Sequence, residues 1–239
     1  MLIEVIIIII EMGDALSTLL FQPPRPTPIK ESKLVWLNTR QGSKIPAFFL
    51  ERPGAKVTFL YSHANAEDIG TVYPWVKFLA KSLHVSILAY DYTGYGLSQP
   101  SIPSEENCYA DIDAAYDYLI NERQILPENI VLYGRSLGSG PSCYLAARTA
   151  EAGSPVAGLI LHAPFLSVFR VVFESGCTLI GDKFPNVDVA PYIRYDLVFI
   201  ITVTTIFFTV NAKAFFYIFW NIHHRLAKVP CIYNSWNSR

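Results

Sequence analysis

The feature that most constrains this chain is the pentapeptide 134–138, Gly-Arg-Ser-Leu-Gly. A short β-branched and aromatic run, 130–133, precedes it, and a segment of helical composition, 141–148, follows it. A strand, a tight turn and a helix in this order are the context in which a G-x-S-x-G pentapeptide forms a nucleophile elbow. Glycines flank the serine because neighbouring side chains would collide in so sharp a turn. The pattern makes Ser136 a candidate nucleophile.

The same position favours the stabilisation of an oxyanion. A serine at the carboxyl end of a strand, with a helix beginning behind it, lies near free backbone N–H groups and the positive end of a helix dipole. We assign one donor to the N–H of Leu137. The second donor in this architecture comes from the loop after an earlier strand, and we assign it to the N–H of Asn65, in the loop that His63 opens.

Continuous apolar runs that alternate with helical segments predict an α/β fold. Strands that are buried on both faces are typical of a mostly parallel sheet that helices cover on both sides. Segments 33–37 and 45–50 flank a polar turn and predict an antiparallel hairpin at a sheet edge. The 239 residues suffice for one such domain. The predicted buried strands are 57–62, 85–90, 130–133 and 156–161, and the predicted helices before the elbow lie near 72–83 and 105–123.

Composition excludes several function classes. The formal net charge is -1 and 16% of the residues are charged, so the chain lacks the basic surface that a nucleic-acid partner requires. Four cysteines are widely spaced without a C-x-x-C pair. We interpret them as reduced, buried thiols and not as a disulfide framework or a zinc site. Neither a metal nor a cofactor is predicted.

Polar side chains stand where the predicted strands end. In this architecture the triad residues follow the order Ser, acid, His, so His63, which precedes Ser136, is not predicted to be the general base. Its alternative role is that of a helix-entry residue with its ring bonded to nearby backbone. Asp91 is predicted to order the glycine-bearing loop that follows it. His162 either lines an acyl pocket or is a structural histidine, and we favour the structural role.

Five motifs follow one another along the chain: Tyr-Ser-His-Ala-Asn-Ala-Glu-Asp at 61–68, Tyr-Asp-Tyr-Thr-Gly-Tyr-Gly-Leu-Ser at 90–98, Pro-Ser-Glu-Glu-Asn at 103–107, Leu-Tyr-Gly-Arg-Ser-Leu-Gly at 132–138 and Phe-Pro-Asn-Val-Asp at 184–188. With these motifs the chain resembles the alpha/beta hydrolase domain-containing protein 17 family. The resemblance extends from about Phe21 to Ile193 and is specific for the family, because several motifs occur in order.

The resemblance implies an α/β-hydrolase fold and the activity of a membrane-associated serine hydrolase that removes palmitate from S-acylated proteins. It implies that Ser136 attacks the thioester carbonyl while the N–H groups of Leu137 and Asn65 hold the oxyanion. The implied partners are palmitoylated proteins and a membrane surface, and the implied location is the cytoplasmic face of plasma or endosomal membranes, with peripheral or tail-anchored attachment. The oligomeric state is not implied.

Two departures from the family pattern lie within the matching region. Ala64 stands where the family has glycine in a His-Gly-Asn-Ala loop, which adds a methyl group where backbone approaches substrate. The N-terminal cysteine cluster through which family members are palmitoylated is absent.

A larger departure begins near Arg194, where the family would continue with a strand, an Asp-bearing loop, a last strand and the catalytic His. No Asp or Glu follows Asp196, and His223 and His224 are the only histidines after His162. A serine without a base and an orienting acid is a poor nucleophile. The alternative function is therefore a catalytically inactive hydrolase-fold protein that binds acylated proteins or membrane.

A substitute triad satisfies the required order on paper. Asp182, Asp188 or Asp196 would supply the acid, and His223 the base. We do not expect an unrelated tail to place these groups with the accuracy that catalysis needs.

The chain divides into three segments: 1–32, an apolar stretch and a Pro-rich surface strap; 33–193, the hydrolase core; and 194–239, a divergent hydrophobic tail. Residues 197–220 are interpreted as a membrane helix, as two β-like strands, or as the product of a truncated or misread gene model, and we favour the last. The core would then lack its last strands and expose a sheet edge.

An alternative start at Met12 would fit an N-myristoylation pattern.

Overall fold

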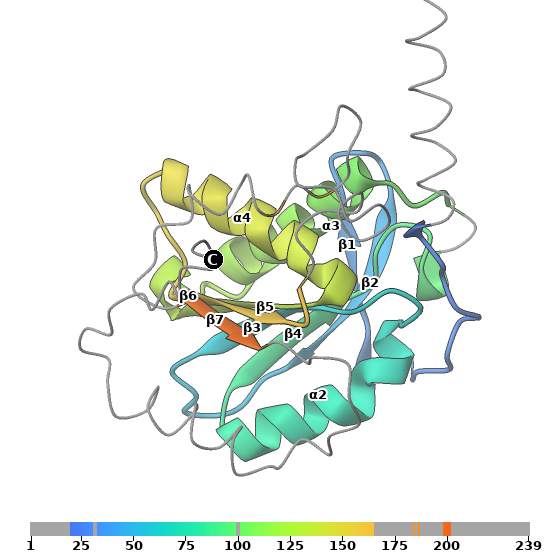
Figure 1. Cartoon of the computed structure of the whole chain (residues 1–239). Helices are drawn as coiled ribbons and strands as arrows, with labels where there is room; N and C mark the ends of the chain where they lie inside the picture. Colours follow the sequence, from blue (N-terminus) through green and yellow to red (C-terminus); the bar gives the residue numbers. More distant parts are fainter. Residues whose placement is uncertain are drawn as a thin grey trace, which may run out of the picture.

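The architecture is a seven-stranded sheet with the strand order β1-β2-β4-β3-β5-β6-β7, between layers of helices (Figure 1). The computed structural model describes residues 20–30, 33–98, 101–164, Phe184, Asn186 and 198–201. The predicted α/β fold, with a mostly parallel sheet and helices on both faces, is confirmed.

The antiparallel part of the sheet is an edge hairpin. Strands β1 (Val35–Asn38) and β2 (Lys44–Leu50) pair antiparallel, as the polar turn between them predicts. Strand β2 also pairs antiparallel with β4 (Ser86–Tyr90). The hairpin therefore extends the sheet on the side away from the pentapeptide.

The parallel part positions the candidate site. Strand β3 (Thr58–Ser62) lies between β4 and β5 (Ile130–Arg135), and β6 (Gly158–His162) pairs with β5. The chain passes from β3 outward to β4 and then returns to the other side of β3 as β5. Open α/β sheets bind ligands beyond the carboxyl ends of their strands at such a switch point. Here that point is formed by the ends of β3 and β5.

Helices cover the two faces unequally. Helix α2 (Ile69–Leu83) lies on one face, and α3 (Glu105–Asp117) and α4 (Ser139–Glu151) lie together on the other (Figure 1). Each face has its own apolar core. Side chains along a strand point alternately to the two faces, so Leu132 packs under α3 and α4 while its neighbours Val131 and Tyr133 pack on the α2 side.

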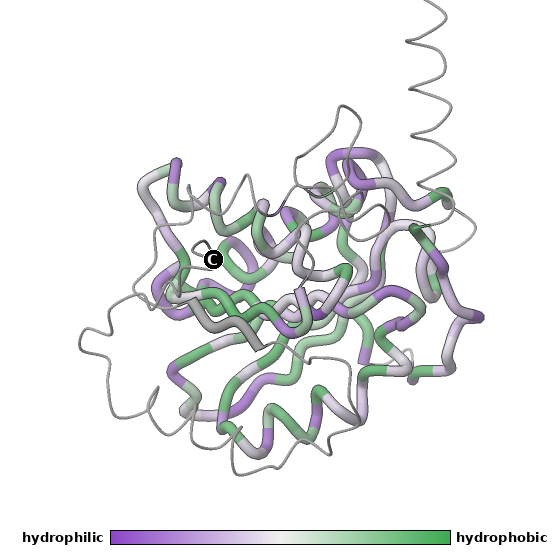
Figure 2. The backbone as a smooth tube through the Cα atoms, in the orientation of Figure 1, coloured by the Kyte–Doolittle hydropathy of each residue, from purple (hydrophilic) through white to green (hydrophobic). Residues whose placement is uncertain are grey.

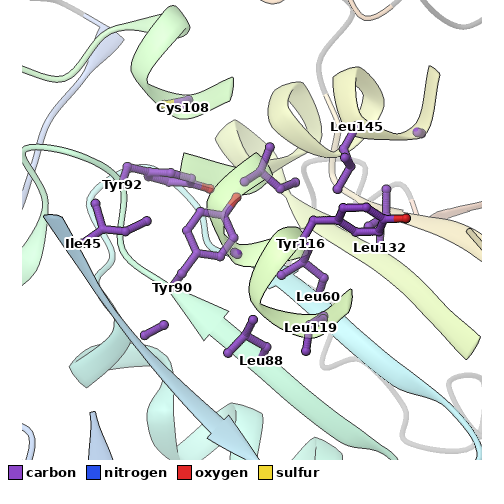
Figure 3. Close-up of a cluster of buried hydrophobic side chains, with 14 of the residues drawn as sticks. Ile45, Leu60, Leu88, Tyr90, Tyr92, Cys108, Tyr116, Leu119, Leu132 and Leu145 are labelled. Atoms are coloured by element: carbon purple, nitrogen blue, oxygen red, sulfur yellow. The ribbon is translucent and has the colours of Figure 1, made fainter. Parts of the chain in front are cut away.

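The larger core lies between the sheet and the α3–α4 layer. Figure 3 shows strand residues such as Leu60, Leu88 and Leu132 clustered with Tyr116, Leu119 and Leu145 of the helical layer. In Figure 2 the central strands are mostly hydrophobic, and hydrophilic residues are more frequent in the helices and loops on either side. The thiols of Cys108 and Cys143 are free and buried, as predicted, and burial raises the pKa of the Cys143 thiol to about 12.

Local capping explains where the helices begin. Helix α2 starts three residues earlier than its apolar pattern predicts, because the Asp68 carboxylate accepts a hydrogen bond from Thr71 N at 2.7 Å and caps the helix. Helix α3 starts at Glu105, as predicted, with Ser104 as its cap. It continues into a π-helical turn, η3 (Tyr118–Glu122).

One strand is present that the sequence analysis does not favour. Val198–Ile201 forms β7, which pairs parallel with β6. It occupies the position in which the family resemblance implies a further strand, and its β-branched and aromatic residues suit a parallel sheet. The described sheet therefore extends one strand further than expected.

Within the described ranges, no helix is both long enough and apolar enough to cross a bilayer. The predicted apolar segment and the Met12 start lie outside the described residues. So do Asp182, Asp188, Asp196 and His223, and so does the predicted membrane segment apart from β7. The three-segment division stays a prediction.

Asp111 is a buried carboxyl group under the loop after β4, and it generates a pH-dependent prediction. It accepts hydrogen bonds from Thr93 N at 2.7 Å and from Thr93 Oγ1 at 2.8 Å. Burial raises its pKa from 3.8 to about 7. The folded state therefore binds the proton more tightly than the unfolded state does. This contribution to stability is fully present below about pH 4 and is lost as the pH rises toward 7.

We predict that Asp111→Asn removes this loss. The free energy of unfolding of the wild type, relative to the Asn variant, should fall by up to a few kcal/mol between about pH 4 and 7 and then level off. Urea unfolding at a series of pH values measures the difference. Parallel stability curves for the two proteins over this range would contradict the raised pKa.

Candidate active site

Ser136 stands on a sharp bend between β5 and α4. Strand β5 ends at Arg135, a single 3₁₀ turn, η5 (Ser136–Gly138), follows, and α4 begins at Ser139. Ser136 has φ 48°, in the left-handed region that L-residues other than Asn and Asp rarely occupy. Such strain persists only where the surrounding structure enforces it, and it occurs often at active sites. The strand, turn and helix expected from the pentapeptide are present.

The two glycines of the pentapeptide are required by close packing. A Cβ atom on Gly138 would lie 2.2 Å from the carbonyl oxygen of Ser62, at the end of β3. A Cβ atom on Gly134 would lie 2.4 Å from the carbonyl oxygen of Gly138 and 2.7 Å from Ser142 Oγ. All three distances are below van der Waals contact, and two of them are to backbone carbonyl oxygens. The missing side chains therefore allow the elbow to fold on itself and to rest against β3.

The predicted oxyanion donors belong to the two segments that this contact brings together. Leu137 lies in the elbow, and Asn65 lies in the loop that follows β3. Among the described residues, no hydrogen bond from the backbone N–H of either residue to a protein acceptor is found. Unpaired N–H groups beside a serine hydroxyl are what an oxyanion hole requires.

The side chain of Asn65 holds its own loop in place. Its Oδ1 accepts hydrogen bonds from Tyr95 Oη at 2.7 Å and from Gln22 N at 3.0 Å, and its Nδ2 donates to the carbonyl oxygen of Leu20. The Pro-rich strap is thus more than a surface connection, because it fixes the oxyanion loop and buries Phe21 in the core. Sequence reasoning missed this role, since nothing in the strap's composition indicates a partner.

An ion pair connects the same loop to the elbow. Arg135, directly before the nucleophile, pairs with Glu67 Oε1, and Glu67 Oε2 accepts a hydrogen bond from Ala64 N at 2.9 Å. A single carboxylate therefore contacts both sides of the proposed oxyanion hole. Ala64 does not have positive φ, so its backbone conformation is one that an L-residue adopts without strain.

His63 is a buried structural residue. Its Nδ1 lies 2.8 Å from the carbonyl oxygen of Ala64, and its Nε2 lies 3.4 Å from Asp91 Oδ1. Its side chain is 1% exposed, which does not fit a general base acting at the surface and agrees with the helix-entry role. Asp91 also accepts from Ile69 N at 2.8 Å. A Cβ atom on Gly96 would lie 1.9 Å from Asp91 Oδ2, so Asp91 supports the glycine-bearing loop as predicted.

His162 lies beside the elbow, at the end of β6. It pairs in register with Arg135, and its Nδ1 lies 3.1 Å from the Tyr133 hydroxyl. Burial, assisted by the positive charge of Arg135, lowers its pKa. His162 is therefore a half-buried imidazole that is hydrogen-bonded to the sheet, which agrees with the favoured structural role.

The back of the elbow is held by a motif from later in the chain. Asn186 Nδ2 donates to Ser139 Oγ at 3.1 Å, and Ser139 Oγ donates to the carbonyl oxygen of Ser136 at 2.7 Å. Phe184 is buried against Gly140, where a Cβ atom would lie 2.2 Å from its ring. Phe184 and Asn186 therefore pack against the start of α4, and their proximity to the nucleophile was not predicted.

The acid and the base of a triad are not identified. Within the described ranges, no hydrogen bond between Ser136 Oγ and a histidine is found. The candidate acids and His223 lie outside those ranges. No cluster of His, Cys, Asp and Glu side chains that would hold a metal ion occurs among the residues that the structure describes.

The fold and the elbow together define a class: a parallel α/β protein that presents a serine at the switch point of its sheet, as the α/β hydrolases do. Residues 57–193 match the family model described as alpha/beta hydrolase fold. The chain belongs to this family.

Its relatives make the comparison more specific. The chain is 42% identical to alpha/beta hydrolase domain-containing protein 17B of Xenopus tropicalis over 152 residues, which cover 63% of this chain and 51% of the relative. Human protein 17B is 41% identical with the same coverage, and protein 17C of Xenopus laevis is 40% identical, with 47% of its length covered. The resemblance drawn from the motifs is confirmed. The chain spans about half the length of these relatives.

Solved structures agree with the fold alone. An alpha-beta hydrolase from Vibrio vulnificus superimposes with a TM-score of 0.56 at 19% identity, covering 76% of this chain and 80% of that one. The Pyrococcus furiosus esterase Pf2001 gives a TM-score of 0.57 at 14% identity, covering 85% of this chain and 96% of the esterase.

The contact between Gly138 and Ser62 generates a stability prediction. Gly138→Ala should lower the free energy of unfolding by about 1–3 kcal/mol, because the new methyl group collides with backbone. Urea unfolding of the wild type and the variant measures this. A Gly138→Ala protein as stable as the wild type would contradict the close contact.

The two hydrogen-bonding oxygens of Glu67 generate a second prediction. Glu67→Gln keeps an acceptor for Ala64 N but loses the ion pair, whereas Glu67→Ala loses both. We expect Glu67→Ala to cost about 1–2 kcal/mol of stability and Glu67→Gln less. Amide hydrogen exchange at Ala64 should be faster in the Ala variant than in the Gln variant.

The matched control for Glu67 is Glu51→Ala. Glu51 pairs with Arg123 at the surface, where the two side chains are 65% and 34% exposed. Exposed pairs of this kind contribute little. If Glu67→Ala were as mild as Glu51→Ala and left exchange at Ala64 unchanged, the bridging role would be wrong.

Proposed function

We propose that this chain is a serine hydrolase that cleaves S-acyl thioesters of palmitoylated proteins through Ser136. The observation that carries the proposal is the conformation of Ser136, a strained residue on a bend that close glycine contacts impose. Residues held in this backbone conformation cluster at active sites.

In the proposed mechanism, Ser136 Oγ attacks the thioester carbonyl carbon and gives up its proton to a base. The carbonyl oxygen becomes an oxyanion, which the N–H groups of Leu137 and Asn65 stabilise. Collapse of this intermediate breaks the C–S bond and leaves an acyl-enzyme, and the cysteine thiol departs after taking up a proton. Water then attacks the acyl-enzyme carbonyl, the ester bond to Ser136 Oγ breaks, and the fatty acid leaves as the serine takes back a proton.

The substrate class rests on the resemblance to the protein 17 family, whose motifs this chain carries around the elbow, the oxyanion loop and Asn186. The corresponding proposal for location is the cytosolic membrane face, where palmitoylated proteins reside.

A second candidate function is an inactive hydrolase fold that binds acylated proteins. It is favoured because the rings of His63 and His162 both form hydrogen bonds with groups other than Ser136. The two candidates differ in whether a base reaches Ser136.

Fluorophosphonate labelling of the full chain separates them. We expect a covalent label on Ser136 and hydrolysis of a fluorogenic S-acyl thioester. Both should fall by on the order of 10³-fold or more in Ser136→Ala. Ser154→Ala, at an exposed serine after α4, is the matched control and should label as the wild type does.

Absence of labelling in a folded wild type would overturn the hydrolase proposal. Labelling that persists unchanged in Ser136→Ala would overturn the assignment of the nucleophile. Retention of a palmitoylated peptide by an unlabelled wild-type protein would support the inactive, acyl-binding alternative.

A further inference from the structure

The outward face of α2 carries two large aromatic side chains. Trp75 is 39% exposed and Phe78 is 57% exposed, and their ring centroids lie 5.8 Å apart. They are i, i+3 neighbours and share one side of the helix. The core contacts come from a buried stripe, which borders Trp75 and lies opposite Phe78: Ile69, Val72, Val76, Leu79, Ala80 and Leu83. The Trp75 side chain also interacts with the buried Tyr61 side chain of β3, so the sheet anchors one edge of its ring, whereas Phe78 is the more exposed member of the pair.

Cationic side chains accompany this pair. Lys77 and Lys81 are exposed i, i+4 neighbours on the same helix. Lys33 lies at the other flank of α2, where it donates from Nζ to the Tyr73 hydroxyl at 2.7 Å, and it does not belong to this face.

Acidic groups do not offset these charges. Helix α2 contains no Asp or Glu. At its start, the Asp68 carboxylate is buried and accepts hydrogen bonds from Thr71 N and Thr27 N. The preceding Glu67 is paired with Arg135. The outward face of α2 is therefore positively charged and aromatic at once.

We propose that this face, formed by Trp75, Lys77, Phe78 and Lys81 and named here the α2 outer face, docks on a bilayer surface that contains anionic phospholipids. Aromatic rings are favourable at the headgroup level, where an apolar body meets a polar boundary. Lysines beside them attract anionic headgroups. The charge complementarity selects a lipid surface of negative charge as the occupant.

Docking in this way would orient the candidate active site. In Figure 1, α2 is the outermost described helix on its face of the sheet. Its 15 residues span about 22 Å, and its first turn adjoins the oxyanion loop. A bilayer against α2 would thus keep the carboxyl edge of the sheet close to membrane-bound acyl chains. The inference rests on the proposed function for the location of the substrate, but not on any chemistry at Ser136.

The test uses the full chain and vesicles of phosphatidylcholine with or without phosphatidylserine. We expect sedimentation with the anionic vesicles. Each lysine contributes about fivefold to binding, so Lys77→Gln/Lys81→Gln should weaken it by about 25-fold at low salt. Trp75→Ser/Phe78→Ser should weaken it by at least about tenfold. Ile102→Ser and Leu126→Ser, at side chains 84% and 56% exposed elsewhere on the surface, are matched controls that should bind as the wild type does.

A residue-specific readout keeps the test independent of other apolar segments. The emission of Trp75, taken as the difference between the wild type and Trp75→Phe, should shift to the blue and be quenched by brominated lipids when anionic vesicles are added. Unchanged Trp75 emission, or equal binding by the α2 variants and the wild type, overturns the proposal. Self-association through Trp75 in vesicle-free buffer would also overturn it, because a second copy would then be the occupant.

Ser136→Ala separates this inference from the proposed function. The variant should bind anionic vesicles as the wild type does, since Ser136 lies outside the α2 outer face. An inert protein that still docks would contradict the hydrolase proposal alone. An active protein whose Trp75 never meets lipid would contradict the docking surface alone.

Discussion

The site depends on one contact, between the elbow glycine and the end of the neighbouring strand. Gly138 lies so close to the carbonyl oxygen of Ser62 that no side chain fits between them. The parallel register of β3 and β5, which places Ser62 opposite Gly134, brings the two segments to this distance. The contact forces the chain to turn immediately after β5, and the turn gives Ser136 its positive φ. The strained nucleophile thus follows from the register of the sheet.

Three groups of contacts then fix the surroundings of the elbow. The N-terminal strap holds the oxyanion loop through the side chain of Asn65. Glu67 connects that loop to Arg135. Asn186, through Ser139, holds the carbonyl group of the nucleophile from behind. Sites that function by preorganised electrostatics need this kind of support, because donors must already point at the position where charge develops. The support comes from segments that are far apart in the sequence.

The sequence was sufficient for the features that local patterns encode. The apolar runs predicted β3, β4, β5 and β6, and the pentapeptide predicted the bend at Ser136. It was insufficient where geometry depends on distant partners. Glu67 and Arg135 are 68 residues apart, and neither type of side chain indicates its partner. The early start of α2 depends on the Asp68 cap, which the apolar period does not detect. Strand β7 occurs in a tail whose composition also fitted two other interpretations.

The most direct measurement of the central claim is a crystal structure of the chain after reaction with a fluorophosphonate. The account predicts phosphorus bonded to Ser136 Oγ and a phosphoryl oxygen about 3 Å from the backbone nitrogen atoms of both Leu137 and Asn65. A phosphoryl oxygen directed to solvent, or an adduct on another residue, would contradict it.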